Sequence, residues 1–132
     1  MELKPGMTGT ATLIVRPEHL AERVGSGHAP VLATPMMVAL MEAAAVDCIE
    51  THLAQGQESL GIKIDIEHIA ATPLGLGVTA TAELMEVNGR AMTFRLEARD
   101  EREIIGRGSH TRIAVDAARF RSKVQAKAPA GT

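Results

Sequence analysis

Aromatic side chains are almost absent from this sequence. Its 132 residues include two phenylalanines but neither tryptophan nor tyrosine, and the formal net charge is −2. Proteins that bind nucleic acids stack bases on aromatic rings and contact phosphates with positive charge. The composition therefore argues against a nucleic-acid-binding protein.

Cysteine and long apolar stretches are also scarce. The single cysteine, Cys48, excludes a disulfide within the chain and is typical of a protein of the reducing cytoplasm. The first ten residues are polar, and no apolar stretch reaches the length of a membrane span, so we expect neither a signal peptide nor a membrane protein. The five histidines lack the spacing of metal ligands, and no glycine-rich nucleotide motif occurs. We expect no bound metal and no cofactor.

The longest apolar segment predicts one helix from residue 34 to about residue 53. Thr34 and Pro35 form a typical helix start, with threonine as N-cap and proline in the first turn. The residues that follow, MMVALMEAAAVDCI, are apolar almost all round, which is typical of a helix buried against a sheet. Glu42 lies in the middle of this run. Because an unpaired buried carboxylate is costly, Glu42 is either a structural hydrogen-bonding group or a catalytic one.

The rest of the chain alternates between apolar and polar residues. This period of two predicts strands at residues 10–15, 62–68, 77–87, 91–99 and 104–115. The last four are expected to form an antiparallel meander, with Asn88-Gly89 as a hairpin turn. A short helix is expected at residues 116–127.

These elements predict an α+β fold in which an antiparallel sheet wraps around one long central helix. We expect a single domain over residues 1–125 and a flexible tail over residues 126–132. One helix cannot cover both faces of a five-stranded sheet, so the uncovered surface predicts a homodimer.

Three residues are candidates for chemistry. His68 continues the face formed by the isoleucines at 62, 64 and 66, which is expected to lie against the helix that carries Glu42. A lone histidine on an apolar face is more often structural, but histidine and glutamate together in a dry cleft form an acid–base pair. Thr34 precedes Glu42 by eight residues, about two helical turns, so the two could line one side of the helix. The positive N-terminus of the helix beside Thr34 would stabilise a developing anion.

Three longer segments resemble a known family. LATPMMVALMEAAAV (32–46), SLGIKIDIEHIAATPLGLGVTATAEL (59–84) and GRGSHTRIAV (106–115) are similar to hotdog-fold thioesterases of the fluoroacetyl-CoA thioesterase type. The resemblance extends from about residue 6 to the C-terminus and includes the spacing of Thr34, Glu42 and His68. It implies hydrolysis of a small acyl-CoA thioester by a homodimer with two active sites at the subunit interface, and the sequence leaves open whether dimers pair further into a tetramer.

The resemblance also implies a role for each site residue. Thr34, Glu42 and His68 would be the catalytic set, with His68 as general base and acid and Thr34 positioning Glu42 and the thioester oxygen. Glu42 would be either a nucleophile that is acylated or a base that orients water, and the sequence leaves both open. Gly61 matches a backbone position that approaches the acyl group, and Arg112 matches a functional arginine near the site.

One departure concerns the loop over residues 25–33. The fluoroacetyl-specific enzymes have a phenylalanine lid there, whereas this loop holds no aromatic residue and has His28 near the matching position. We therefore expect a general short-chain acyl-CoA thioesterase, with His28 contacting substrate.

Two alternatives remain from the residues alone. One is an acyl-CoA hydratase or dehydratase on the same fold, although such enzymes set aspartate and histidine where Thr34-Pro35 stands here. The other is a non-catalytic acyl-CoA-binding protein, in which Glu42 and His68 only satisfy each other.

Overall fold

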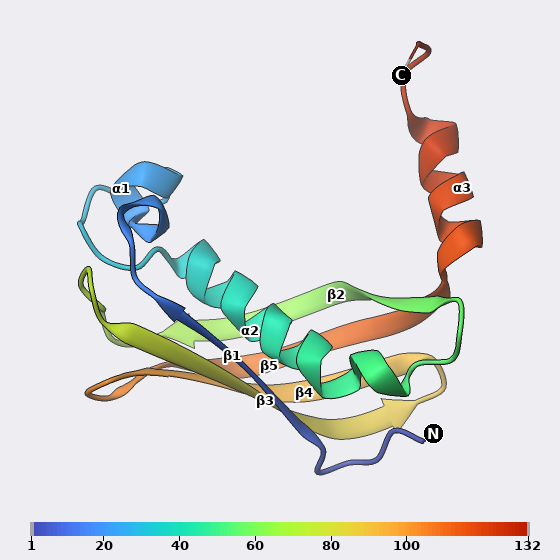
Figure 1. The fold of residues 1–132 in the computed structure, drawn as a ribbon, viewed down its shortest axis with the longest axis horizontal. Helices are drawn as coiled ribbons and strands as arrows, with labels where there is room; N and C mark the ends of the chain where they lie inside the picture. Colours follow the sequence, from blue (N-terminus) through green and yellow to red (C-terminus); the bar gives the residue numbers. More distant parts are fainter. Residues whose placement is uncertain (1, 132) are drawn as a thin grey trace.

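The computed structural model describes residues 2–131 and has one curled sheet with a long helix lying across it (Figure 1). The sheet is antiparallel, with the strand order β1-β3-β4-β5-β2. Its strands are β1 (Thr8–Ile14), β2 (Gln57–His68), β3 (Gly77–Asn88), β4 (Ala91–Asp100) and β5 (Ile104–Asp116). The helices are η1 (Pro17–His19), α1 (Ala21–Val24), α2 (Thr34–Ile49), η2 (Glu50–His52) and α3 (Ala117–Lys127). The predicted α+β fold, a sheet wrapped around one central helix, is confirmed.

The predicted four-stranded meander is wrong, because β2 pairs with β5 and not with β3. The segment between β2 and β3 crosses the end of the sheet instead of turning back. Along this path the Ile69 amide donates to the carbonyl of Ile105, and Thr72 donates to Asp100. The Gly75 amide then donates to the carbonyl of Val15, just beyond β1. In sequence, this crossing looks like an ordinary turn, since alternation shows which residues are strands but not which strands pair.

The core lies between α2 and the concave face of the sheet. On the sheet, small buried residues let the helix approach closely, and larger ones such as Phe94 and Leu96 fill the remaining space. The closest approach is made by β1: a Cβ at Gly9 would lie 2.3 Å from the Ala44 carbonyl oxygen and 2.4 Å from the Cys48 amide nitrogen. Strand β1 therefore packs backbone to backbone against α2.

We expect Gly9→Ala to destabilise the fold by roughly 1–3 kcal/mol or more, because the added methyl group meets helix backbone rather than a flexible side chain. Thermal unfolding of the variant measures this loss. Gly27→Ala is the matched control, since its methyl group would only touch the Ala21 side chain at an ordinary 3.7 Å. Equal melting temperatures for the two variants would contradict the close packing of β1 on α2.

The helix is less buried than its sequence suggests. One side of α2 remains uncovered in the single chain, where Pro35, Ala39 and Ala43 are exposed. The Glu42 side chain lies beside this surface and is 42% exposed, so the expectation of a fully buried carboxylate is wrong. The sequence of α2 is apolar on nearly all sides, but only one side of the helix packs against the sheet of its own chain.

The edge strand β2 adds to the uncovered apolar surface. Ile66 packs against the core as predicted, but Ile62 is 56% exposed and Ile64 is 40% exposed. A register shift between Gly61 and Lys63 leaves Ile62 outside the pairing with β5. The prediction that the whole isoleucine face of β2 is covered by the helix is therefore wrong for these two residues.

The chain leaves the sheet through α3, which projects away from the body (Figure 1). Its N-cap is Asp116, whose side chain accepts a hydrogen bond from the Arg119 amide. The helix runs to Lys127 and so includes the first two residues of the tail that the sequence predicts. The division into a domain over residues 1–125 and a flexible tail stays a prediction. Within residues 2–131, no helix is long and apolar enough to cross a membrane.

Candidate active site

The first half of the candidate site is a threonine–histidine pair. His68 ends β2 and Thr34 begins α2, and the Thr34 Oγ1 and His68 Nδ1 share a hydrogen bond of 2.7 Å. The prediction that Thr34 is the N-cap is wrong, because Ala33 takes that position and the threonine hydroxyl makes no capping bond. Its hydroxyl is used to orient the imidazole instead.

The crossing segment after β2 is what brings these two residues together. The Leu32 amide, just before α2, donates to the Thr72 carbonyl at 2.8 Å, and Val31 forms a bridge with Pro73. Thr72 is completely buried and donates through its hydroxyl to Asp100 at 2.9 Å. The run A-A-T-P therefore anchors the start of the helix beside the end of β2.

The environment of His68 favours the neutral form of its imidazole. Burial lowers the pKa of His68 and outweighs the opposing effect of the Ala70 backbone, so the imidazole is neutral near pH 7. Its Nε2 is buried and has no hydrogen-bond partner within residues 2–131. An orphaned buried nitrogen calls for a partner such as water or a ligand. Together with Thr34, His68 lines a hollow of about 300 Å³ whose other walls are small or aliphatic, among them Ser26, Val31 and Ala70.

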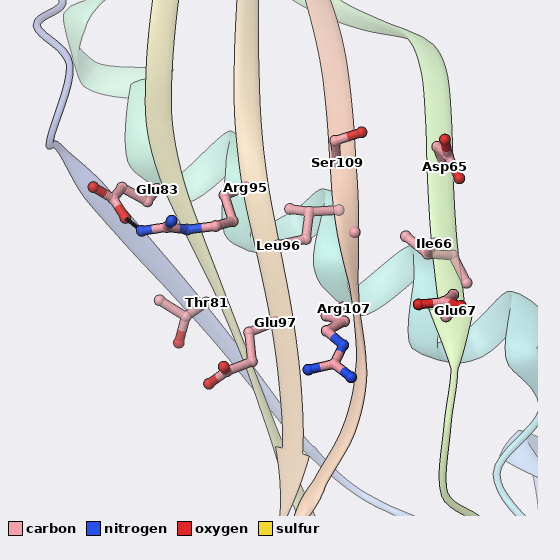
Figure 2. A pocket seen from close by; sticks show the side chains of 11 residues that line it. Asp65, Ile66, Glu67, Thr81, Glu83, Arg95, Leu96, Glu97, Arg107 and Ser109 are labelled. Carbon is pink, nitrogen blue, oxygen red and sulfur yellow. Dashed lines mark hydrogen bonds and ion pairs between the residues drawn. The ribbon is translucent and has the colours of Figure 1, made fainter.

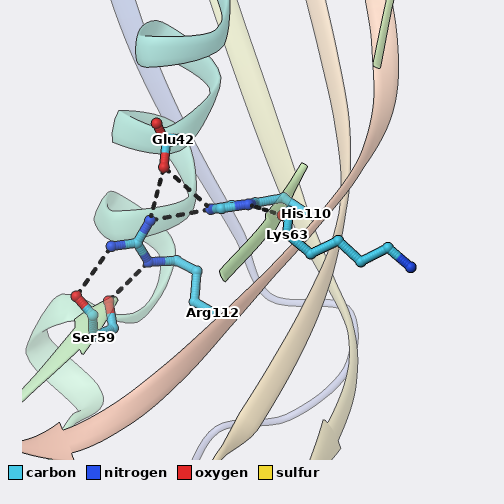
Figure 3. A network of polar contacts seen from close by, with 5 residues as sticks. All are labelled: Glu42, Ser59, Lys63, His110 and Arg112. Carbon is cyan, nitrogen blue, oxygen red and sulfur yellow. Dashed lines mark hydrogen bonds and ion pairs between the residues drawn. The ribbon is translucent and has the colours of Figure 1, made fainter. Parts of the chain in front are cut away.

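The second half of the candidate site is centred on Glu42 (Figure 3). The Glu42 Oε2 lies 3.6 Å from Nη1 of Arg112 and 3.9 Å from Nε2 of His110. Arg112 is held firmly: its Nε donates to the Ser59 hydroxyl at 2.8 Å, and its Nη2 donates to the Ser59 carbonyl at 3.1 Å. Arg112 and His110 are almost fully buried, and the guanidinium of Arg112 is the fixed positive charge that faces the carboxylate.

Of the two predicted substrate-binding residues Gly61 and His28, only Gly61 lies next to one of the candidate catalytic residues. A Cβ at Gly61 would lie 2.7 Å from the Glu42 Oε2, so glycine is what leaves room for the carboxylate. His28 is exposed in the loop before α2 and is not among the residues that line the hollow beside Thr34. Its substrate contact stays a prediction.

The three predicted catalytic residues do not form one cluster in the single chain. Thr34 and Glu42 are eight residues apart on α2, which separates them by about 12 Å along the helix axis. Across the described part of the chain, no hydrogen bond or ion pair joins Glu42 to Thr34 or His68. The structure therefore places the candidate residues in two separate clusters, Thr34–His68 and Glu42–Arg112, which we call the two candidate half-sites.

The sequence did not place Ser59 or His110 beside Glu42 and Arg112, although His110 and Arg112 together suggested contact with an anion. The sequence signal that could have found His110 is its spacing, because residues two apart on a strand, such as His110 and Arg112, lie on the same face of the sheet. In the structure His110 pairs with Phe94 of β4, whose side chain lies in the core. That register is visible only in the folded sheet, and Ser59 reaches Arg112 from a different strand.

A larger hollow, of about 730 Å³, lies on the outer face of the sheet (Figure 2). It is lined mainly by charged residues, including the Glu83–Arg95 ion pair, and contains none of the predicted site residues. No group of histidine, cysteine or acidic side chains within residues 2–131 is arranged to hold a metal ion.

Comparison with known proteins places this geometry in a family. The sequence model of the fluoroacetyl-CoA-specific thioesterases matches residues 15–118. The chain belongs to this family of thioester hydrolases. A curated fluoroacetyl-CoA thioesterase from Streptantibioticus cattleyicolor is 46% identical over 101 residues, which are 76% of this chain and 73% of that protein.

Solved structures agree with the family assignment. A structure of the fluoroacetyl-CoA thioesterase FlK is 37% identical, with a TM-score of 0.90, covering 98% of this chain and 100% of that one. A hot-dog-like protein from Thermanaerovibrio acidaminovorans, 19% identical, has a TM-score of 0.86 over 96% of this chain and 94% of its own. The resemblance and the hotdog fold inferred from the sequence are confirmed.

Proposed function

We propose that this thioesterase hydrolyses short-chain acyl-CoA thioesters to the free acid and CoA, using Thr34, Glu42 and His68. The observation that carries the proposal is the buried, unpartnered Nε2 of a neutral histidine, oriented by Thr34 at the start of α2. Family membership supports the reaction class.

The chemistry follows from the two half-sites. The start of α2 carries the positive end of the helix dipole, which stabilises the oxyanion that develops on the thioester carbonyl. If water attacks the carbonyl, neutral His68 accepts a proton from that water and passes it to the departing CoA thiolate. If the Glu42 carboxylate attacks, it forms an anhydride as the CoA thiolate leaves; His68 then accepts a proton from the water that hydrolyses the anhydride, and that proton goes to the thiolate. Glu42 supplies the carboxylate that either attacks the carbonyl or orients the attacking water.

A second copy of the chain is needed to complete each site. Strand β2 lies at an edge of the sheet with exposed isoleucines, and one side of α2 is uncovered, so both are candidate surfaces for self-association. Two copies related by a two-fold axis would bury these surfaces on both partners. We propose that Glu42 of one protomer serves the Thr34–His68 pair of its partner, giving two equivalent sites in a homodimer.

The walls of the Thr34–His68 hollow support a small acyl group. Ala21, Ser26, Ala70 and Ala71 are short, and Val31 and Leu32 add an apolar surface. No aromatic side chain lies over the hollow from the preceding loop, so fluoroacetyl-CoA is expected to be one substrate among several rather than the exclusive one.

Release of free CoA thiol from a series of acyl-CoAs tests the proposal. The series contains acetyl, fluoroacetyl, propionyl, butyryl and longer acyl groups, with wild type and Glu42→Gln assayed in parallel. We expect turnover that is highest for short chains and about 10²–10⁴-fold lower in the variant, since Gln keeps the size of the side chain but cannot act as a base or nucleophile. Glu67→Gln is the matched control, because Glu67 is exposed and precedes His68 on the same strand.

Two further measurements, made where no thiol is released, would identify the function that replaces the rejected proposal. Tight calorimetric binding of acyl-CoA without thiol release indicates a binding protein, and consumption of an enoyl-CoA without thiol release indicates a hydratase. Light scattering of the same samples measures whether the protein is a monomer, a dimer or a tetramer.

A further inference from the structure

His110 is a buried histidine whose protonation is fixed by its two neighbours. It is only 2% exposed and lies on β5 opposite Phe94 of β4. Its Nδ1 lies 2.7 Å from the Lys63 carbonyl oxygen, which can only accept a hydrogen bond. Its Nε2 lies 3.0 Å from Nη1 of Arg112, which can only donate one. The ring is therefore neutral, with its proton on Nδ1 and a lone pair on Nε2.

The charged groups around the ring favour this neutral form. Arg112 faces it from β5 and Glu42 from α2, while β2 offers the Lys63 carbonyl and directs the Lys63 ammonium away (Figure 3). Burial lowers the pKa of His110, and the Arg112 charge adds to this effect against the opposing Lys63 carbonyl and Glu42. A proton on Nε2 would face the Arg112 guanidinium directly.

The Nε2 lone pair and the Glu42 carboxylate both face Nη1 of Arg112, but the histidine lies closer to it. Nη1 of Arg112 is within hydrogen-bond distance of His110, at 3.0 Å, but 3.6 Å from the Glu42 oxygen. Two of the five N–H groups of the guanidinium, one on Nε and one on Nη2, already donate to Ser59. The histidine thus holds Nη1 back from a close ion pair, in which the carboxylate would be a weaker base and nucleophile.

We propose that His110 is a positioning residue for the hydrolysis. Its Nε2 lone pair keeps Arg112 from closing onto Glu42, so that the carboxylate stays beside Gly61 and remains reactive. This inference rests on the proposed function only because it takes Glu42 to be a reacting group. The distances among Glu42, His110 and Arg112 can be tested separately from the reaction.

Two substitutions separate the two hydrogen bonds of His110. Asparagine places an amide near the position of Nδ1, which keeps the donor to Lys63 but removes the acceptor for Arg112. Glutamine reaches the position of Nε2 and restores that acceptor. We expect His110→Asn to lower kcat by about 10–100-fold with little change in KM, and His110→Gln to retain most of the wild-type kcat.

Thermal unfolding and crystal structures of both variants complete the test. We expect similar melting temperatures, and an Arg112 Nη1 that moves to within about 3.2 Å of Glu42 in His110→Asn but not in His110→Gln. If the two variants lose kcat alike, or if Arg112 stays in place in both, the proposal is overturned and His110 is merely structural. If the wild type releases no thiol, the proposed function fails. The position of Arg112 in the two variant structures still shows whether His110 sets the distance between Arg112 and Glu42.

Discussion

Mixing two inactive variants, Glu42→Gln and His68→Ala, is expected to restore thioester hydrolysis. Each variant alone should lose about 10²–10⁴-fold in kcat, because each lacks one reacting group. If Glu42 serves the Thr34–His68 pair of its partner, a mixed dimer has one doubly substituted site and one intact site. Random mixing makes half of the dimers mixed, so about a quarter of the wild-type activity should return.

A third variant supplies the control for this experiment. Thr34 and His68 share a hydrogen bond within one chain, so Thr34→Ala and His68→Ala damage the same half-site. Mixing these two should restore nothing, whereas mixing Thr34→Ala with Glu42→Gln should restore activity. Co-expression with two different affinity tags isolates the mixed dimers before the assay. If neither mixture with Glu42→Gln gains activity in isolated mixed dimers, all three groups act within one protomer.

The sequence predicts the secondary structure well because periodicity is local. The long helix starts at its predicted N-cap, Thr34, one residue before its predicted first residue, and the ends of the strands differ from the predicted ranges by at most five residues. Strand order could not be predicted in the same way. It depends on a crossing segment whose Thr72 is buried against Asp100, a contact between residues 28 positions apart in the sequence.

In the candidate site, too, local features could be predicted from the sequence and contacts between distant segments could not. Thr34, Glu42 and His68 stand out because a threonine at a helix start, an acid in an apolar run and a histidine on an apolar face are unusual in their local settings. The partners of these residues are not local. Glu42 meets Arg112 and His110 from β5, and the hydroxyl of Thr34 turns to His68 instead of capping its own helix. No pattern within one segment encodes such contacts, and a single chain holds only the two separate halves.

Replacing Gly61 by alanine is expected to remove most of the turnover without unfolding the protein. The added methyl group would lie 2.7 Å from the Glu42 Oε2, 3.0 Å from His110 Cε1 and 3.3 Å from Nη1 of Arg112. Of these atoms, the carboxylate oxygen is the end of the most flexible side chain and the one approached most closely. The carboxylate is therefore the group that moves, and a displacement of about 1 Å at a reacting group lowers kcat by roughly 10²-fold.

Gly77→Ala is the matched control for this substitution. Gly77 begins β3, and its new methyl group would also meet a flexible carboxylate, that of Glu101, at 3.3 Å. We expect both variants to keep melting temperatures close to that of the wild type, but only Gly61→Ala to lose turnover. A Gly61→Ala variant with full kcat would show that Glu42 acts from a position away from Gly61. Because Arg112 is the cation that faces Glu42 at that position, such a result would show that the carboxylate reacts away from the Arg112 guanidinium.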